Sequence, residues 1–179
     1  MLTDPSFCTE RRVCGINRSS AEPPYLNGCY SEHIILATGT NLFLVDKNID
    51  PAVLVTTSCS GATIANAFDL APCKLGDTVV VQDPGPLGIF AVAFAKAHEA
   101  SHIIMIGGSP ERMSLCREFE ATHLINRNET TVAERREAVL NLIHGRGADL
   151  VLEAVGYPDA LAEGLELVQF REASWLKLQ

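Results

Sequence analysis

Residues Thr78–Gln82 (TVVVQ) lead directly into a turn rich in proline and glycine and then into an alanine-rich segment, Ile89–His98. A continuous β-branched run of this kind is typical of a strand that is buried on both faces of a parallel sheet. The small residues along the following segment favour a helix that packs closely on that strand. A strand, a tight turn and a helix in this order restrict the chain to α/β folds with parallel strands.

The rest of the chain continues the same alternation. Asp50 as N-cap, with Pro51 in the first helical position, predicts a helix that runs to about Leu70. Further strands are predicted at 102–106, 123–125 and 149–153, and further helices at 110–119, 132–144 and 159–168. We therefore expect a doubly wound parallel sheet with right-handed crossovers.

The first fifty residues differ from this pattern. Residues 1–30 are rich in Pro, Ser, Asn and Arg and show neither a helical nor a strand period. Between Tyr30 and Val45, the short apolar runs HIIL and LFLV flank a polar turn, and they predict two strands.

Charge and composition narrow the class of partner. The 179-residue chain has a net charge of −8, which does not favour nucleic acid or an anionic membrane. The N-terminus lacks the apolar region of a signal peptide, and the apolar run Ile89–Ala97 is too short to span a bilayer. We therefore expect a cytoplasmic protein. Its six cysteines have no secretory context and are expected to be reduced thiols.

The turn Asp83–Gly88 (DPGPLG) is a candidate phosphate-binding loop. Dinucleotide sites use G-x-G-x-x-G between a strand and a helix, so that the backbone approaches the pyrophosphate at the helix N-terminus. Gly85 and Gly88 occupy the second and third glycine positions, and the predicted cofactor-binding residues here are Gly85, Pro86, Leu87 and Gly88. The alternative is a tight turn without a ligand. Asp83, at the first glycine position, favours that alternative unless its carboxylate turns away.

The next strand should end in an acid that holds the adenine ribose. It ends instead in Gly107-Gly108-Ser109, and Glu111 comes only inside the following helix. The missing acid leaves room for the 2′-phosphate of NADP, which Ser109 and Arg112 could contact. The alternative for Arg112 is a solvated helix residue. An acid introduced at position 107 is expected to shift the preference toward NAD.

Several segments together resemble the zinc-dependent medium-chain dehydrogenase/reductase superfamily. They are NGCYSEHI, SCSGATIANAF, KLGDTVVVQDPGPLG, SPERMSLCREF and GADLVLEAVG, and the similarity covers about residues 8–168. The chain looks most similar to the alcohol dehydrogenase-like branch that includes threonine and sorbitol dehydrogenases. The resemblance implies a GroES-like catalytic domain and a Rossmann domain, with catalytic zinc and NAD or NADP as cofactors. It also implies a small-molecule alcohol as substrate and a homo-oligomeric full-length parent.

The resemblance assigns roles to a few residues. Cys59 resembles the last catalytic zinc ligand of the family, although a buried structural thiol is the alternative. Cys8 resembles the fourth ligand of the structural zinc lobe. Val155 and Gly156 match positions beside the nicotinamide, or else simply end a strand. Glu153 closes the nicotinamide side of the sheet in the family, but it could also be a strand-end carboxylate in solvent.

The chain also departs from the family pattern. Asp83, Glu99 and Glu120 stand where the family usually has glycine, and the last two positions are helix C-caps that require φ > 0. The remaining zinc ligands and two further strands are missing. We therefore expect residues 1–50 to be a remnant of the GroES-like β domain, 51–170 an incomplete Rossmann sheet of about four strands, and 171–179 an aberrant tail.

The expected function is NAD(P)-dependent oxidation of a secondary alcohol or polyol, in a chain truncated at both ends and inactive as it stands. Two alternatives remain open. One is a catalytically dead nucleotide-binding module. The other is a zinc-free, quinone reductase-like member of the superfamily, which the contexts of Cys59 and Cys8 argue against.

Overall fold

The computed structural model describes residues 16–17, 19, 21–23, 25, 30–36, 38–40 and 42–169, together with the backbone of 174–177. The chain divides into two compact units, Met1–Asp46 and Lys47–Gln179. The boundary lies four residues before the one expected from the sequence.

In the first unit, the two predicted strands are wrong. Residues 33–36 and 42–46 have no regular secondary structure and form no strand ladder. Their apolar side chains are exposed, from 38% at Ile34 to 104% at Leu44. A short apolar run forms a strand only where a neighbouring strand satisfies its N–H and C=O groups. The described part of this unit supplies no such neighbour.

The second unit begins with a long helical segment composed of α1 (Pro51–Thr56), η2 (Thr57–Gly61) and α2 (Ala62–Leu70). The Asp50 carboxylate accepts a hydrogen bond from the amide of Ala52 at 2.8 Å, and Pro51 occupies the first turn. The predicted helix start is therefore confirmed. The middle of the segment, η2, is a π-helical turn. No helix among the described residues is long and apolar enough to cross a bilayer.

The sheet has five parallel strands in the order β3 (His123–Asn126), β2 (His102–Gly107), β1 (Thr78–Gln82), β4 (Leu150–Glu153) and β5 (Ser174–Lys177). The expected parallel sheet of about four strands, β1 to β4, is confirmed, and β5 is added to it at the edge. Residues of the tail pair with the open edge of β4. A strand edge presents unpaired N–H and C=O groups, so an adjacent segment can extend the sheet.

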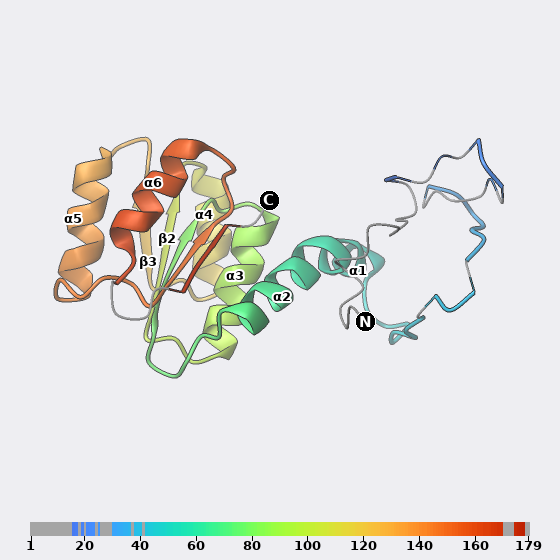
Figure 1. Ribbon diagram of the computed structural model, residues 1–179. Helices are drawn as coiled ribbons and strands as arrows, with labels where there is room; N and C mark the ends of the chain where they lie inside the picture. The colour runs from blue at the N-terminus through green and yellow to red at the C-terminus, as the bar shows by residue number, and fades with distance from the viewer. Residues whose placement is uncertain are drawn as a thin grey trace, which may run out of the picture. The chain divides into compact units, whose positions relative to one another are not determined.

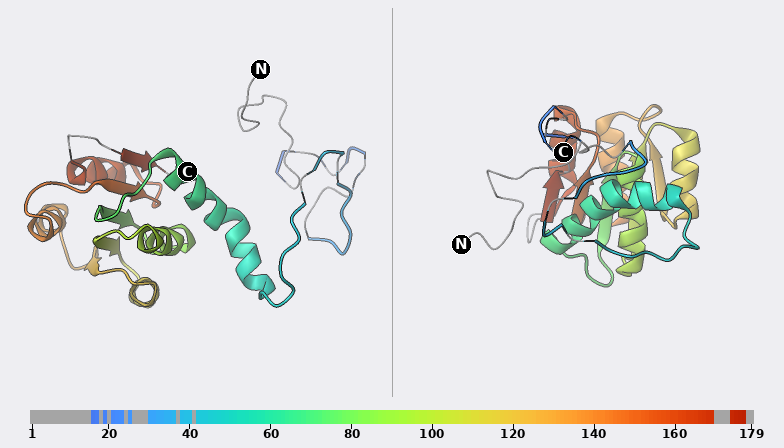
Figure 2. Two further views of the ribbon diagram at one scale, coloured as in Figure 1. Left: turned by 90° about the horizontal axis from the view of Figure 1, so that it is seen from below. Right: turned by 90° about the vertical axis from the view of Figure 1, so that its right-hand side faces the viewer.

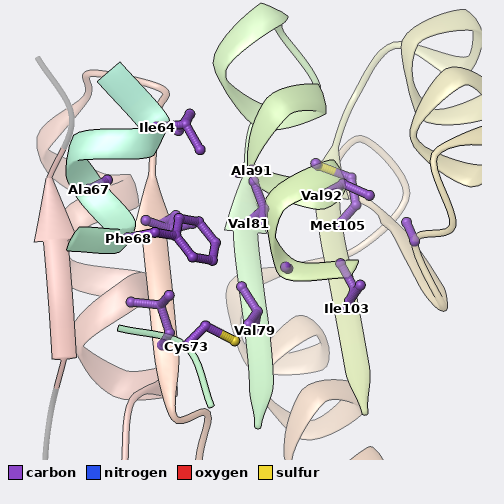
Figure 3. Packing of buried hydrophobic residues seen from close by; sticks show 14 of the residues in the cluster. Ile64, Ala67, Phe68, Cys73, Val79, Val81, Ala91, Val92, Ile103 and Met105 are labelled. Carbon is purple, nitrogen blue, oxygen red and sulfur yellow. The ribbon is translucent and has the colours of Figure 1, made fainter. Parts of the chain in front are cut away.

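Helices cover both faces of this sheet. Residues of α2, α3 (Pro86–Ala97) and α4 (Pro110–Glu118) pack on one face, and α5 (Val132–Leu142) and α6 (Pro158–Leu167) pack on the other (Figures 1 and 2). Side chains alternate along the strands, so that Val79 and Val81 belong to the first core and Val80 to the second. In the first core, Phe68 of α2 lies toward Val79 and Val81 (Figure 3).

The strand order determines where a ligand can enter. From β1 the chain builds β2 and β3 on one side and then crosses to β4 on the other side of β1. In such sheets, the crossovers leave a crevice beyond the carboxyl ends of the strands at this switch point. Gln82 and Glu153, the last residues of β1 and β4, are register partners there.

Candidate functional site

The turn between β1 and α3 brings the helix N-terminus very close to the strand. Gly85 is the N-cap of α3, and Pro86 occupies its first turn. A Cβ on Gly88 would lie 1.9 Å from the carbonyl oxygen of Asp83, so only glycine fits there. This is the close helix–strand approach that the third glycine of a dinucleotide fingerprint allows.

Asp83 takes the left-handed backbone conformation of a first glycine, with φ of +88°. Its amide donates to the carbonyl of Ile106 at 3.0 Å, and its Oδ2 accepts a hydrogen bond from the amide of Gly85 at 3.1 Å. The carboxylate thus turns back onto its own loop. Because Pro86 has no N–H, the amides of Leu87 and Gly88 are the donors that the first turn of α3 offers to an anion.

The end of β2 has no space for a side chain at Gly107. A Cβ there would lie 2.5 Å from Cδ and 2.7 Å from Cγ of Pro84, which is buried. The expectation that an acid at position 107 alone would favour NAD is therefore not supported. The ring of Pro84 occupies the position that such a side chain would need.

Ser109 and Arg112 do not converge on one point. Ser109 caps α4 by accepting from the amide of Arg112 at 3.4 Å, and its hydroxyl donates to Oε2 of Glu111 at 3.0 Å. Hydrogen bonds from its own backbone amide and from Ser109 lower the pKa of Glu111. Ser109 is therefore engaged with a carboxylate. Arg112 is exposed on α4 and does not line the cavity beyond the carboxyl ends of the strands.

A cavity of about 310 Å³ opens beyond the carboxyl ends of β1, β2 and β3, on the face covered by α5 and α6. Of the predicted cofactor-binding residues, Val155 contributes to its wall. The lining residues are Gln82, Ile106, Arg127, Val132, Arg135, Val155, Tyr157, Pro158, Asp159, Ala160 and Glu163.

Two buried polar side chains lie at the switch point. Glu153 is 0% exposed, so the solvent-facing alternative for it is wrong. Its Oε1 accepts from the amides of Val155 and Gly156 at 2.6 and 2.7 Å, which fixes the loop after β4. Glu153 Oε2 and the Oε1 of the cavity-lining Gln82 have no hydrogen-bond partner among the described residues. Buried polar atoms of this kind normally have a partner, so they point to a ligand or to water in the crevice.

An ion pair forms part of the cavity wall. Arg135 of α5 donates from Nε and Nη2 to the two carboxylate oxygens of Glu163 of α6, at 2.6 and 3.0 Å. Both side chains are less than a tenth exposed. Because the two charges neutralise each other, the pair gives the wall polarity without net charge.

The described residues do not form a zinc site. Cys59 is exposed in η2, and no group of three His, Cys, Asp or Glu side chains gathers in the part of the chain that the structure describes. Cys8 lies outside the described residues. Burial raises the pKa of the Cys73 and Cys116 thiols to about 11, as expected of thiols that pack in the core.

Sequence reasoning missed Pro84, Gln82 and Arg127. Each stands at or just after the carboxyl end of a predicted strand, where parallel α/β sheets place their ligands. That position was the available signal. Which of these residues face the crevice depends on the strand order, which the sequence does not state.

Comparison with known proteins agrees with this geometry. The family model of zinc-binding dehydrogenases matches residues 86–173. An alcohol dehydrogenase structure from Thermotoga maritima superposes with a TM-score of 0.87 at 48% identity, over 92% of this chain and 46% of that one.

Curated relatives agree as well. The 5-exo-hydroxycamphor dehydrogenase of Pseudomonas putida is 37% identical over 78% of this chain and 39% of its own length. The L-threonine 3-dehydrogenase of Bacillus subtilis is 29% identical over 89% of this chain and 42% of its own length. The chain thus spans less than half the length of these relatives. Together with the parallel sheet and its glycine turn, these matches show that the chain belongs to the zinc-binding, medium-chain alcohol dehydrogenase family.

Proposed function

We propose that this chain is the dinucleotide-binding part of an NAD(P)-dependent oxidoreductase that oxidises a secondary alcohol or polyol. We further propose that the chain alone binds dinucleotide without turning over an alcohol. The observation that carries the proposal is the crevice at the switch point, between the turn before α3 and a cavity into whose wall Gln82 brings a buried carboxamide oxygen that has no partner among the described residues. The named relatives act on hydroxycamphor and threonine, which supports a secondary alcohol as the substrate class.

Each part of the crevice would hold one part of the cofactor. The amides of Leu87 and Gly88, with the positive end of the α3 dipole, face the position of the pyrophosphate. The wall formed by Ile106 suits the flat adenine base. On the nicotinamide side, Glu153 fixes the loop of Val155 and Gly156 by accepting hydrogen bonds from their amides. The nicotinamide ring, when bound, accepts the hydride.

The second half of the proposal rests on the metal chemistry. A catalytic zinc requires at least three protein ligands, and Cys59 offers one. The described residues bring no second and third ligand to it. We therefore expect neither tight zinc binding nor zinc-dependent alcohol oxidation by the purified chain.

Titration calorimetry with NAD and NADP tests the binding half. We expect weak binding, because the carboxylate of Asp83 places negative charge beside the pyrophosphate position. Asp83→Gly should tighten the binding of both cofactors by a similar factor. Asp83→Asn, which removes the charge but keeps the side chain, separates charge from backbone freedom. A folded chain and a folded Asp83→Gly variant that bind neither dinucleotide would refute the proposal.

Metal analysis and an alcohol oxidation assay test the claim that the chain alone neither binds zinc tightly nor oxidises an alcohol. The chain is refolded with and without zinc and then assayed with NAD and NADP against secondary alcohols and polyols. Zinc-dependent turnover, or a tetrahedral zinc site with three or more protein ligands, would show that the chain is more than a binding module.

A further inference from the structure

We propose that Arg127 is the specificity-determining residue of this site and that it recognises the 2′-phosphate of NADP. The inference rests on the proposed dinucleotide site and adds which cofactor the site prefers and why. It replaces Arg112 of α4, the candidate from the sequence, with the residue that directly follows β3.

The position of Arg127 is set by the pairing of β2 and β3. Gly107 and Asn126 are register partners, and the amide of Arg127 donates to the carbonyl of Gly107 at 2.8 Å. The Arg127 Cγ would lie 3.2 Å from a Cβ built on Gly108. The arginine stem therefore passes over the carboxyl end of β2, where a dinucleotide fold places the adenine ribose.

The charges around the cavity leave Arg127 as its available cation. Arg135, the other arginine of the wall, is neutralised by Glu163. No hydrogen bond or ion pair occupies the Arg127 guanidinium among the described residues, and its side chain is exposed at the mouth. Asp159, at the start of α6, is the unpaired acid of the lining. A guanidinium binds phosphate in a forked, charge-assisted geometry.

The neighbouring residues disfavour NAD for a steric reason. The ring of Pro84 excludes any side chain at Gly107, so no carboxylate from this position can accept the 2′-hydroxyl of NAD. Ser109 already donates to Glu111. At the end of β2, a 2′-phosphate can thus bind the Arg127 guanidinium. A 2′-hydroxyl finds no carboxylate on this strand to accept its hydrogen bond.

The test compares Arg127→Gln with Arg112→Gln in the full chain, and Arg127→Lys serves as the conservative variant. Calorimetry measures NADP against NAD, and adenosine 2′,5′-bisphosphate against adenosine 5′-monophosphate, which contain no nicotinamide. Arg127→Gln should weaken both 2′-phosphorylated ligands by about 10- to 100-fold and change the other two by less than about twofold. Arg127→Lys should retain part of the preference, and Arg112→Gln should leave all four affinities unchanged.

The preference for NADP should also weaken with added salt in the unchanged chain, but not in Arg127→Gln. An unchanged NADP/NAD ratio in Arg127→Gln, or a loss of preference in Arg112→Gln, would overturn the assignment and leave the proposed dinucleotide site intact. A folded chain that binds none of the four ligands would overturn the proposed site as well. Circular dichroism shows whether each variant is folded. We expect all of them to fold, because Arg127 and Arg112 are both exposed.

Discussion

Arg135 and Glu163 join α5 to α6 through a two-pronged ion pair beneath the surface of the second unit. Besides Glu163, the guanidinium binds the carbonyl of Thr130 at 2.6 Å, so the loop before α5 is held by the same group. Hydrogen bonds to Glu163 raise the pKa of Arg135, which therefore stays charged in the folded chain. One residue further along α5 and three further along α6, Arg136 and Glu166 form an exposed pair at 3.6 Å.

Removing one partner of the buried pair should destabilise the fold. Glu163→Gln leaves the Arg135 charge buried without its counter-ion, and we expect a loss of about 3 to 5 kcal/mol in the free energy of unfolding. The exposed pair gives a matched control, because Glu166→Gln should change stability by less than about 1 kcal/mol. Urea unfolding followed by circular dichroism measures both. Equal effects of the two substitutions would contradict the role given to burial.

The turns after α3 and α4 carry glutamates in a conformation that suits glycine. Glu99 and Glu120 have φ of +59° and +73°, which confirms the left-handed backbone expected from the sequence. Glu99→Gly should therefore stabilise the chain by about 1 kcal/mol. Glu99→Ala keeps the Cβ and its strain and serves as control. Thermal unfolding should show a higher Tm for the glycine variant alone, and a gain in the alanine variant would point to charge instead.

His123 should make stability depend on pH. Burial, the neighbouring His102 and Arg117 lower the pKa of His123 from its ordinary value of about 6.5. The folded state thus binds the proton less readily than the unfolded state does. This contribution is present above about pH 6.5 and is lost as the pH falls through that value toward the lower folded pKa. His123→Asn should flatten stability between about pH 7 and 5. His33→Gln is the control and should leave the pH dependence of stability unchanged. If His123→Asn also leaves it unchanged, His123 is not its origin.

Gln82 should oppose folding and favour binding. Its buried oxygen lacks a partner, so Gln82→Leu should raise stability without ligand by about 1 kcal/mol. The same change should reduce the rise in Tm that saturating NADP produces, because the ligand loses a polar partner. Thr78, also buried with an unpartnered hydroxyl at the opposite end of β1, gives a control as Thr78→Val. That variant should gain stability and keep the full response to NADP.

Local chemistry explains why part of this structure could be predicted. Thr78–Gln82 and the turn after it contain their own signals, and the strand, the glycine approach and the caps at Asp50 and Ser109 match the structure. The cavity could not be predicted in this way. Its wall combines Gln82, the last residue of β1, with Arg127, which directly follows β3, and β2 separates these two strands in the sheet. The short apolar runs around Ile34 and Phe43 misled, because an apolar run does not say whether a partner strand lies beside it.

The contact between Pro84 and Gly107 limits the order in which this site can change. A descendant that acquired Asp at 107 first would force its Cβ against a rigid ring at 2.5 Å and would lose the turn before gaining a new preference. A descendant that first exchanged Pro84 for Ala would open the space without using it, and Gly107→Asp could then follow. Cofactor choice is therefore coupled to a residue that need not touch the cofactor. Selection for NAD could proceed if Pro84 is replaced before Gly107, and it would be blocked if Gly107 is replaced first.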